Sequence, residues 1–218
     1  MNSTIKIAIF VFCAWLFCLP VGARADIPSL DQLLTLLRNR YKQVDDLSAN
    51  FVQTTKVKTI SKDQKAEGKA YFKRPGKMRF DYETPPKKSF ISDGSTLWMH
   101  SVDEKKYLKS PMPKDQGADV PMEILAGNID LSTKFDASIL GMDEGKAMLE
   151  LRPKTESSYR KVILYIDSVS GELYKSVITD LYGNDVTMLF SNIKINQKLS
   201  DSVFVVKPGP GEEIISSQ

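Results

Sequence analysis

The stretch that decides the fold is residues 68–98, GKAYFKRPGKMRFDYETPPKKSFISDGSTLW. Within residues 77–83, apolar and charged side chains alternate, so a strand there points Met78, Phe80 and Tyr82 to one face. The side chains between them are all charged and point to the other face. This alternation is typical of an antiparallel sheet that packs one face and exposes the other to solvent.

Arg74 ends the preceding predicted strand, residues 66–74, on the same face as Phe72. A guanidinium group against an apolar surface is costly unless its N–H donors find acceptors. Two interpretations stay open. Either Pro75 ends the strand and Arg74 turns to solvent at the rim, or Arg74 is a gate residue with a partner on a covering element.

Residues 1–25 have the features of a cleaved signal peptide. Lys6 precedes an apolar run over residues 7–19, and Ala23-Arg24-Ala25 matches an A-x-A cleavage site. The rival interpretation, a membrane anchor, needs about 20 apolar residues, and this run is shorter. We therefore expect a soluble exported chain that begins at Asp26.

The remaining residues, 26–218, suit a single domain. Both cysteines, Cys13 and Cys18, lie in the predicted signal, so the exported chain has no thiol for a disulfide or for catalysis. Two basic residues lie there too, which leaves a chain close to neutral. This charge does not indicate a nucleic-acid partner.

A helix is predicted to follow the signal. Ser29 and Gln32 form a capping box, and an apolar stripe about 14 residues long follows at helical spacing. The stripe consists of Leu30, Leu33, Leu34, Leu37, Tyr41 and Val44. The pattern favours packing on the sheet for most of these residues, and it leaves open that some of them line a cavity.

Residues 114–130 interrupt the strand pattern. A short helix is predicted over residues 121–126, because Pro121 suits a first turn and Gly127-Asn128 suits a helix end. Such a helix is too short to be stable alone, so its apolar residues must rest on another part of the chain. These residues are Met122, Ile124 and Leu125. We expect this segment to be a lid.

Period-two alternation separated by turn signals fills most of the rest of the chain. The strand segments outside the opening stretch are residues 47–53, 96–102, 105–109, 135–140, 147–152, 159–167, 173–181 and 186–195. Counting all segments gives about eleven strands, with a small turn at 201–204 and a loose tail from 208 onward. A sheet this large tends to curl, so we predict a curled antiparallel sheet with an apolar concave side and a helical cover.

Catalytic and metal-binding signatures are missing from the sequence. His100 is the one histidine and lies among apolar residues, where a strand position is favoured over a base or a ligand. No nucleophile elbow, P-loop or dinucleotide fingerprint is present. The sequence therefore indicates a binding protein, with no catalytic residue, metal or cofactor.

Fragments spread in order through the chain resemble the periplasmic outer-membrane lipoprotein carrier family, LolA-like. They are Phe51-Val52-Gln53, Gly68, Lys73-Arg74-Pro75, Arg79-Phe80-Asp81-Tyr82 with Pro85, Ser92-Asp93-Gly94, Leu97-Trp98, Asp180, Gly183-Asn184, Phe190, Asn192-Ile193, Asn196, Phe204 and Pro208. The resemblance implies an unclosed antiparallel β-barrel with a helical lid over an apolar cavity. It also implies a monomeric carrier without enzymatic activity.

The resemblance implies a function as well. Such carriers bind the acyl chains of lipoproteins that an inner-membrane ABC transporter releases, and they deliver them through the periplasm to an outer-membrane acceptor. The family's lid-latching arginine corresponds to Arg74, and VPMEILAG corresponds to its lid helix, with Pro121, Met122, Ile124 and Leu125. An aromatic that governs transfer in some members is replaced here by Met78, so that role is not carried over.

Candidate residues for the acyl-chain cavity share apolar character and a predicted inward face. They are Leu33, Leu37, Phe51, Phe72, Met78, Phe80, Tyr82 and Trp98. Three other functions stay open from the sequence. These are a periplasmic lipid sensor or regulator on the same fold, a carrier of another lipid and, least favoured, a lipid-modifying enzyme that uses carboxylates.

Overall fold

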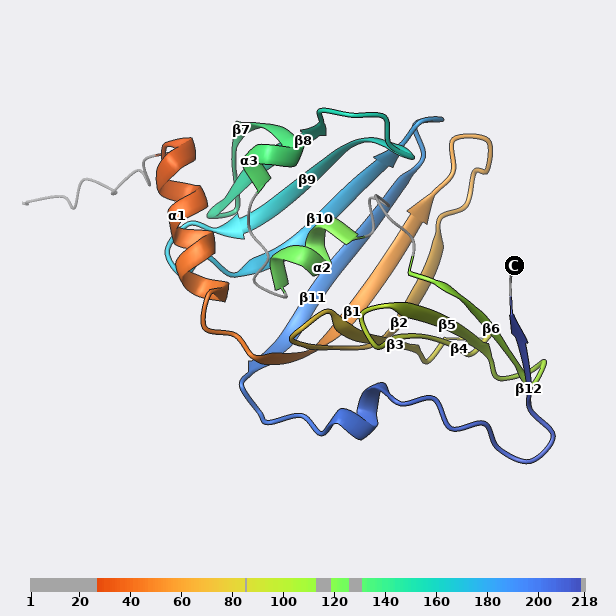
Figure 1. The fold of residues 1–218 in the computed structure, drawn as a ribbon. Coiled ribbons are helices and arrows are strands. Elements are labelled where there is room, and N and C mark those ends of the chain that lie inside the picture. Colours follow the sequence, from red (N-terminus) through yellow and green to blue (C-terminus); the bar gives the residue numbers. More distant parts are fainter. Residues whose placement is uncertain (1–26, 85, 113–118, 126–130, 217–218) are drawn as a thin grey trace, which may run out of the picture.

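One curved sheet organises the chain in the computed structural model, which describes residues 27–84, 86–112, 119–125 and 131–216 (Figure 1). Among these residues the sheet has twelve strands. They are β1 Asp46–Lys56, β2 Gln64–Lys73, β3 Lys77–Tyr82, β4 Lys88–Ser92, β5 Thr96–Ser101, β6 Lys106–Pro111, β7 Phe135–Asp143, β8 Lys146–Pro153, β9 Tyr159–Asp167, β10 Leu173–Asp180, β11 Asp185–Ile195 and β12 Glu213–Ser216.

The strand order is β12-β6-β5-β4-β3-β2-β1-β11-β10-β9-β8-β7. Neighbouring strands are consecutive in the chain and antiparallel, with two exceptions. The β1–β11 pair joins two meanders, and β12 pairs with β6 in parallel. The outermost strands, β12 and β7, do not pair with each other, so the sheet is unclosed. The prediction of a mainly β, unclosed antiparallel architecture is confirmed.

The prediction of a loose tail after residue 208 is wrong in one part, because Glu213–Ser216 forms β12 beside β6. All four of its side chains are exposed, so its sequence lacks the alternation of apolar and polar residues that predicts a strand. Backbone pairing holds it in place, beginning with the Glu213 N–H that donates to the Lys105 carbonyl at 3.0 Å. The predicted turn at Asp201–Phe204 is present as a short 3-10 helix, η1.

Helix α1, Leu30–Tyr41, begins where the capping box predicts. The Ser29 side chain accepts from the Gln32 N–H, and the Gln32 side chain accepts from the Ser29 N–H at 2.8 Å. Its inner side buries Leu33, Leu37 and Tyr41 completely. The Leu173 N–H donates to the Tyr41 hydroxyl at 3.0 Å, and burial raises the pKa of Tyr41 to about 12. This bond joins α1 to the start of β10.

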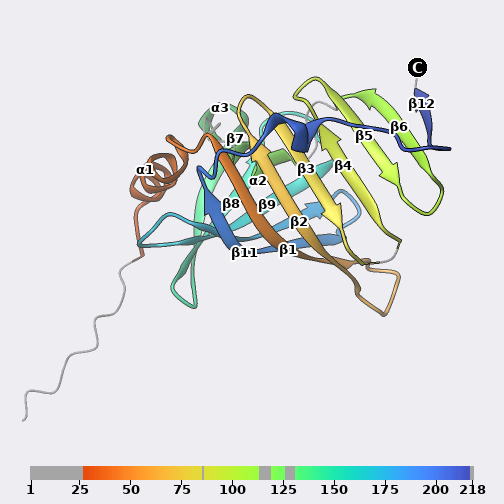
Figure 2. The same ribbon diagram turned by 90° about the horizontal axis from the view of Figure 1, so that it is seen from below.

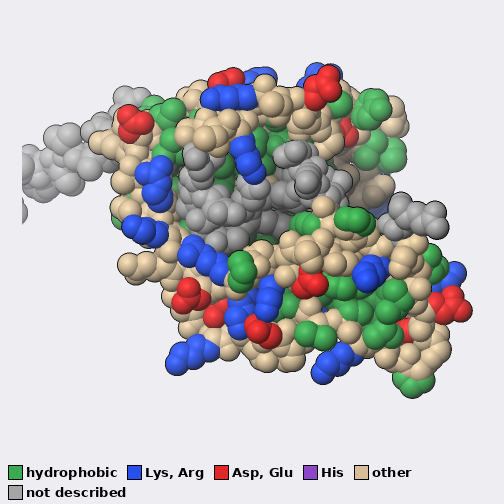
Figure 3. Space-filling model, in the orientation of Figure 1, with side chains coloured by type: hydrophobic (Ala, Val, Ile, Leu, Met, Phe, Trp, Pro, Cys, Tyr) green, Lys and Arg blue, Asp and Glu red, His purple; other side chains and the backbone are tan. Residues whose placement is uncertain are grey.

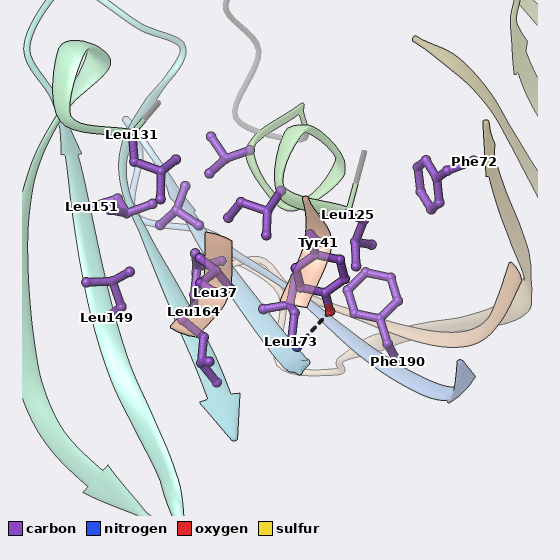
Figure 4. Packing of buried hydrophobic residues seen from close by; sticks show 14 of the residues in the cluster. Leu37, Tyr41, Phe72, Leu125, Leu131, Leu149, Leu151, Leu164, Leu173 and Phe190 are labelled. Carbon is purple, nitrogen blue, oxygen red and sulfur yellow. Dashed lines mark hydrogen bonds between the residues drawn. The ribbon is translucent and has the colours of Figure 1, made fainter. Parts of the chain in front are cut away.

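Two short helices follow β6. Helix α2, Asp119–Leu125, includes residues 121–125 of the predicted helix 121–126, whose last residue lies outside the described ranges. Helix α3, Leu131–Lys134, leads directly into β7 without having been predicted. Both lie on the concave side of the sheet with α1 (Figures 1 and 2). Buried apolar residues of α1, α2, α3 and the concave face form one cluster, part of which is drawn in Figure 4. The core therefore fills the space between sheet and helices.

Candidate functional site

Five aromatic rings lie in a continuous row on the concave face of β1–β4. Successive ring centroids are 5.5 Å apart for Phe72 and Phe80, 5.4 Å for Phe80 and Phe51, 4.9 Å for Phe51 and Tyr82, and 5.8 Å for Tyr82 and Phe90. Neighbouring rings are tilted or edge-on, the arrangement that aromatic pairs prefer. We call these five residues the aromatic floor. Strand register explains the row, because Phe80 lies directly opposite Phe90 on β4.

Gly68 makes room for the aromatic floor. It pairs with Phe51 on one side and with Tyr82 on the other. A Cβ atom at this position would lie 1.9 Å from the Asp81 carbonyl oxygen and 2.9 Å from the Phe51 ring. Only glycine therefore permits both the β2–β3 pairing and the inward position of the Phe51 ring.

The helices cover the concave face beyond the floor, where α1 contacts β7 and α2 contacts β10. Leu33 and Leu37 of α1 and Ile124 and Leu125 of α2 are buried in the same cluster as the floor. Figure 4 draws Leu125 among Tyr41, Leu173 and Phe190, which belong to the same cluster. A seven-residue helix has little stability of its own, so these apolar contacts hold α2 in place.

The floor becomes polar toward the far ends of β1 and β3. The Tyr82 hydroxyl donates to Gln53 Oε1 at 2.7 Å, and Gln53 Nε2 donates to Thr55 at 3.2 Å. Burial raises the pKa of Tyr82 to about 12. Lys88 Nζ lies 4.8 Å from the centre of the Tyr82 ring. Away from α1, the concave face thus offers hydroxyl, amide and ammonium groups.

Arg74 lies where β2 ends beside α1. Its Nη2 donates to the Tyr41 carbonyl at 2.8 Å and its Nη1 to the Lys42 carbonyl at 3.1 Å. These carbonyls lie at the C-terminal end of α1, where the helix dipole favours a cation. The guanidinium group therefore ties the end of one covering helix to the rim of the sheet.

Trp98 lies apart from the other candidates. Trp98 lies opposite Ile91, which lies opposite Arg79 on β3. The floor residues Phe80 and Phe90 instead lie in line with Met99, the residue after Trp98. Since directly opposed residues share a face, Trp98 points to the outer side of the sheet. The structure thus does not bring it together with the aromatic floor.

The outer face between β3 and β6 is covered, which the prediction of a solvent-facing side did not anticipate. The segment after β11 crosses it (Figure 2) and buries Phe204 against this side. Arg79 Nη1 donates to the Val203 carbonyl at 3.0 Å. His100 stacks on Tyr107 with ring centroids 4.0 Å apart and contacts Glu212 Oε1 at 2.9 Å. His100 is thus part of a packing contact, as its position in a predicted strand indicates.

The remaining candidates fall into two groups. Six of them lie in the buried cluster and Tyr82 borders it; the six are Leu33, Leu37, Phe51, Phe72, Met78 and Phe80. Of the predicted lid residues, Pro121, Ile124 and Leu125 are buried, while the Met122 side chain lies outside the described residues, as do residues 1–25. The candidate residues did not include Tyr41 and Phe190, which are both buried in the cluster. Tyr41 lies on the apolar stripe of the predicted helix, which is the signal that could have identified it.

Metal-binding clusters and membrane-spanning helices are both absent from the described ranges. No group of three or more histidine, cysteine, aspartate or glutamate side chains there could hold a metal ion. No helix in those ranges combines the length and the hydropathy that a membrane crossing requires.

Comparisons with known proteins agree with this geometry. The model of the family described as outer membrane lipoprotein carrier protein LolA matches residues 42–207. An outer-membrane lipoprotein carrier protein of Nitrosospira multiformis is 29% identical over 206 residues, 94% of this chain and 97% of that protein. One from Chromobacterium violaceum is 30% identical over 173 residues, 78% of this chain and 81% of that protein.

Among solved structures, an uncharacterized conserved protein from Thermus thermophilus superposes with a TM-score of 0.57 at 13% identity. The match covers 86% of this chain and 98% of that one, and it shows a shared fold. The family model matches most of the chain, and the two named relatives cover 94% and 78% of it. The chain therefore belongs to the LolA family of outer-membrane lipoprotein carrier proteins.

Proposed function

We propose that this protein shelters the acyl chains of lipoproteins between the aromatic floor and the covering helices, and so carries them through water. The observation that supports this most directly is α2, a seven-residue helix whose buried side chains rest on the concave face. A cover this short can be displaced by an apolar ligand that replaces its contacts. The carriers of this family are not enzymes, and the proposed action is binding and release.

The energetics favour moderate net affinity. Each CH₂ group removed from water contributes about 0.8 kcal/mol. Displacing Ile124 and Leu125 from the cluster costs part of this gain, because their own apolar surface returns to water. Cargo can then pass to an acceptor that binds acyl chains without such a cost.

Arg74 is proposed to hold the closed state. Its two hydrogen bonds to the carbonyls of Tyr41 and Lys42 fix the end of α1 against β2. Arg74→Leu removes both bonds, makes opening easier and should strengthen retention of cargo about tenfold, equivalent to about 1.4 kcal/mol. Retention is measured as the fraction of fluorescent lipopeptide that stays bound when excess acceptor vesicles are added.

Arg38→Leu is the matched control for that experiment. Arg38 also lies on α1, but its side chain is exposed. The control removes one positive charge without affecting the two bonds at the helix end. Release from Arg74→Leu at the wild-type rate would contradict the latch role.

Partners and location follow from the same proposal. We propose that residues 1–25 are removed on export, that residues 26–218 act as one domain in the periplasm, and that the domain works as a monomer. An inner-membrane ABC transporter would load it, and an outer-membrane acceptor would unload it. Family membership supports these proposals, since carriers of this family are periplasmic.

Displacement of a fluorescent fatty-acid probe tests the function. Triacylated lipopeptide should displace the probe from purified residues 26–218, whereas the same peptide without acyl chains should not. Mass spectrometry of copurifying lipids adds a second readout. A bound glycolipid or polyprenoid, without displacement by lipopeptide, would contradict the proposal and favour a carrier of another lipid.

A further inference from the structure

Two hairpin turns far apart in sequence form one projecting tip. They are residues 57–63, between β1 and β2, and residues 181–184, between β10 and β11, and together we call them the paired tip. Pairing of β1 with β11 reaches Lys56 and Asp185 at this end. The Lys58 N–H then donates to Asn184 Oδ1 at 3.0 Å. Figures 1 and 2 both place these turns at the end of the molecule away from α1.

The paired tip exposes large apolar side chains. Tyr182 is 83% exposed, Leu181 49% and Ile60 48%. Their side chains do not form the turn, because Asp180 Oδ1 holds it by accepting from the N–H groups of Tyr182 and Asn184, both at 2.8 Å. Figure 3 shows hydrophobic side chains at the upper right, where these turns lie. Scattered exposed residues are ordinary, but three on one projection formed by two hydrogen-bonded turns indicate a contact surface.

Positive charge surrounds these apolar residues. Residues 56–65, KVKTISKDQK, contain four lysines and one acidic residue. Arg160 adds a guanidinium group, whose Nη2 donates to the Leu181 carbonyl at 2.6 Å. Asp180 and Asp185 accept hydrogen bonds from neutral groups of the second turn and keep their negative charge. With Asp63 they make three carboxylates, which the four lysines and Arg160 outnumber. The paired tip is therefore apolar at its apex and cationic around it.

We infer that the paired tip docks on the surface of a phospholipid bilayer with anionic headgroups. Tyrosine is enriched at the boundary between headgroups and acyl chains, where its ring is buried and its hydroxyl stays hydrated. Lysines next to such a residue are attracted by anionic lipids. The complementary charge and the projecting apex favour a bilayer over a flat protein surface.

Docking in this orientation brings the polar end of the aromatic floor toward the bilayer. Gln53 and Tyr82 lie toward the same end of β1 and β3 as the paired tip. The inference goes beyond the proposed carrier function, because cargo-free protein should bind vesicles whether or not it accepts acyl chains.

Flotation with vesicles tests the inference. Cargo-free residues 26–218 should float with phosphatidylcholine vesicles that contain phosphatidylglycerol, and not with phosphatidylcholine alone. Binding should disappear near 1 M salt, where the screening length falls to about 3 Å. Lys62→Glu should weaken binding at least about fivefold, and Leu181→Ser with Tyr182→Ser should abolish it. Equal binding to neutral vesicles, or no binding to either kind, would overturn the inference.

A matched control and a second readout guard against misfolded variants. Val169→Ser removes an 85% exposed apolar side chain in the β9–β10 turn, at the opposite end of the sheet, and should leave flotation unchanged. An environment-sensitive dye on Tyr182→Cys should brighten with anionic vesicles, and the same dye on Val169→Cys should not. Equal responses from the two dyes would overturn the inference. Unchanged binding of the fatty-acid probe by the serine variants separates this test from that of the carrier function.

Discussion

The two halves of this sheet bury opposite faces. Beneath the helices, β8 and β9 bury their concave side, where Leu149, Leu164 and Ile166 are inaccessible to solvent. On β6 the outer face is the buried one, with Tyr107 beneath the C-terminal segment, while the concave face of β5 and β6 leaves Met99 and Leu108 exposed. The element that covers each half decides which alternate residues are buried there. Four predictions test this comparison.

The largest effect is expected at Gly68, in β2 between the strands that carry Phe51 and Tyr82. Gly68→Ala should lower the free energy of unfolding by about 4 kcal/mol, above the usual range for overpacking, because its Cβ would clash with a backbone carbonyl. Urea denaturation measures this. Gly209→Ala, whose Cβ would approach a Glu212 side chain at 3.5 Å, is the control and should be neutral. Equal stability of both variants would show that β2 and β3 can separate here at little cost.

The next prediction compares the loss of stability when a concave-face leucine is truncated in each half of the sheet. Leu164→Ala creates a cavity under the helices and should cost about 3 kcal/mol. Leu108→Ala removes an exposed side chain from the concave face of β6 and should cost less than about 0.5 kcal/mol. Comparable losses in thermal or urea unfolding would contradict the assignment of opposite buried faces.

Phe204→Ala probes the cover of the outer face. Truncating a buried phenylalanine commonly costs about 3–5 kcal/mol, but the C-terminal segment can detach locally, so we expect about 2 kcal/mol. Hydrogen exchange should show loss of protection in β12 and along β6, with β8 and β9 unaffected. A uniform loss over both halves would show that the cover and the core unfold together.

The smallest expected effect is electrostatic. The hydrogen bond from Lys146 Nζ, 2.9 Å from Asp167 Oδ2, holds the pKa of Asp167 below its usual range, with help from N–H groups of the following turn. Stability from a lowered carboxyl pKa is present above about pH 4 and is lost as the pH falls through the folded-state value. Asp167→Asn should thus cost about 1 kcal/mol at pH 7 and little near pH 2.

Asp201 is the counterpart in the other half. Lys73 and Lys77 lower its pKa, but its side chain is largely exposed. Asp201→Asn should therefore show a smaller pH-dependent loss than Asp167→Asn in acid titrations of stability. A larger loss for Asp201→Asn would contradict the expectation that the more exposed carboxylate contributes less to stability.

These contrasts explain what the sequence could predict. Alternation in β3 predicts that Met78 and Phe80 share a face, and the Ser29 capping box predicts the start of α1, because both signals are local. The prediction that Trp98 lines the cavity is wrong for a different reason. Trp98 does lie in a strand, but no local signal shows which face of that strand is the concave one. Strand β12 was not predicted, because it is held by backbone pairing with β6, about 105 residues earlier in the chain, and not by a local pattern of side chains.

The pairing of β12 with β6 has a consequence for the behaviour of the protein at high concentration. An open sheet has two edges, and an unpaired edge can template association with another chain. Here β12 covers the edge of β6, and it is only four residues long with no side chain buried, which makes it a poor template itself. At the opposite edge, α3 and α1 contact β7. The fold can thus leave its barrel open without offering a long free strand for polymerisation.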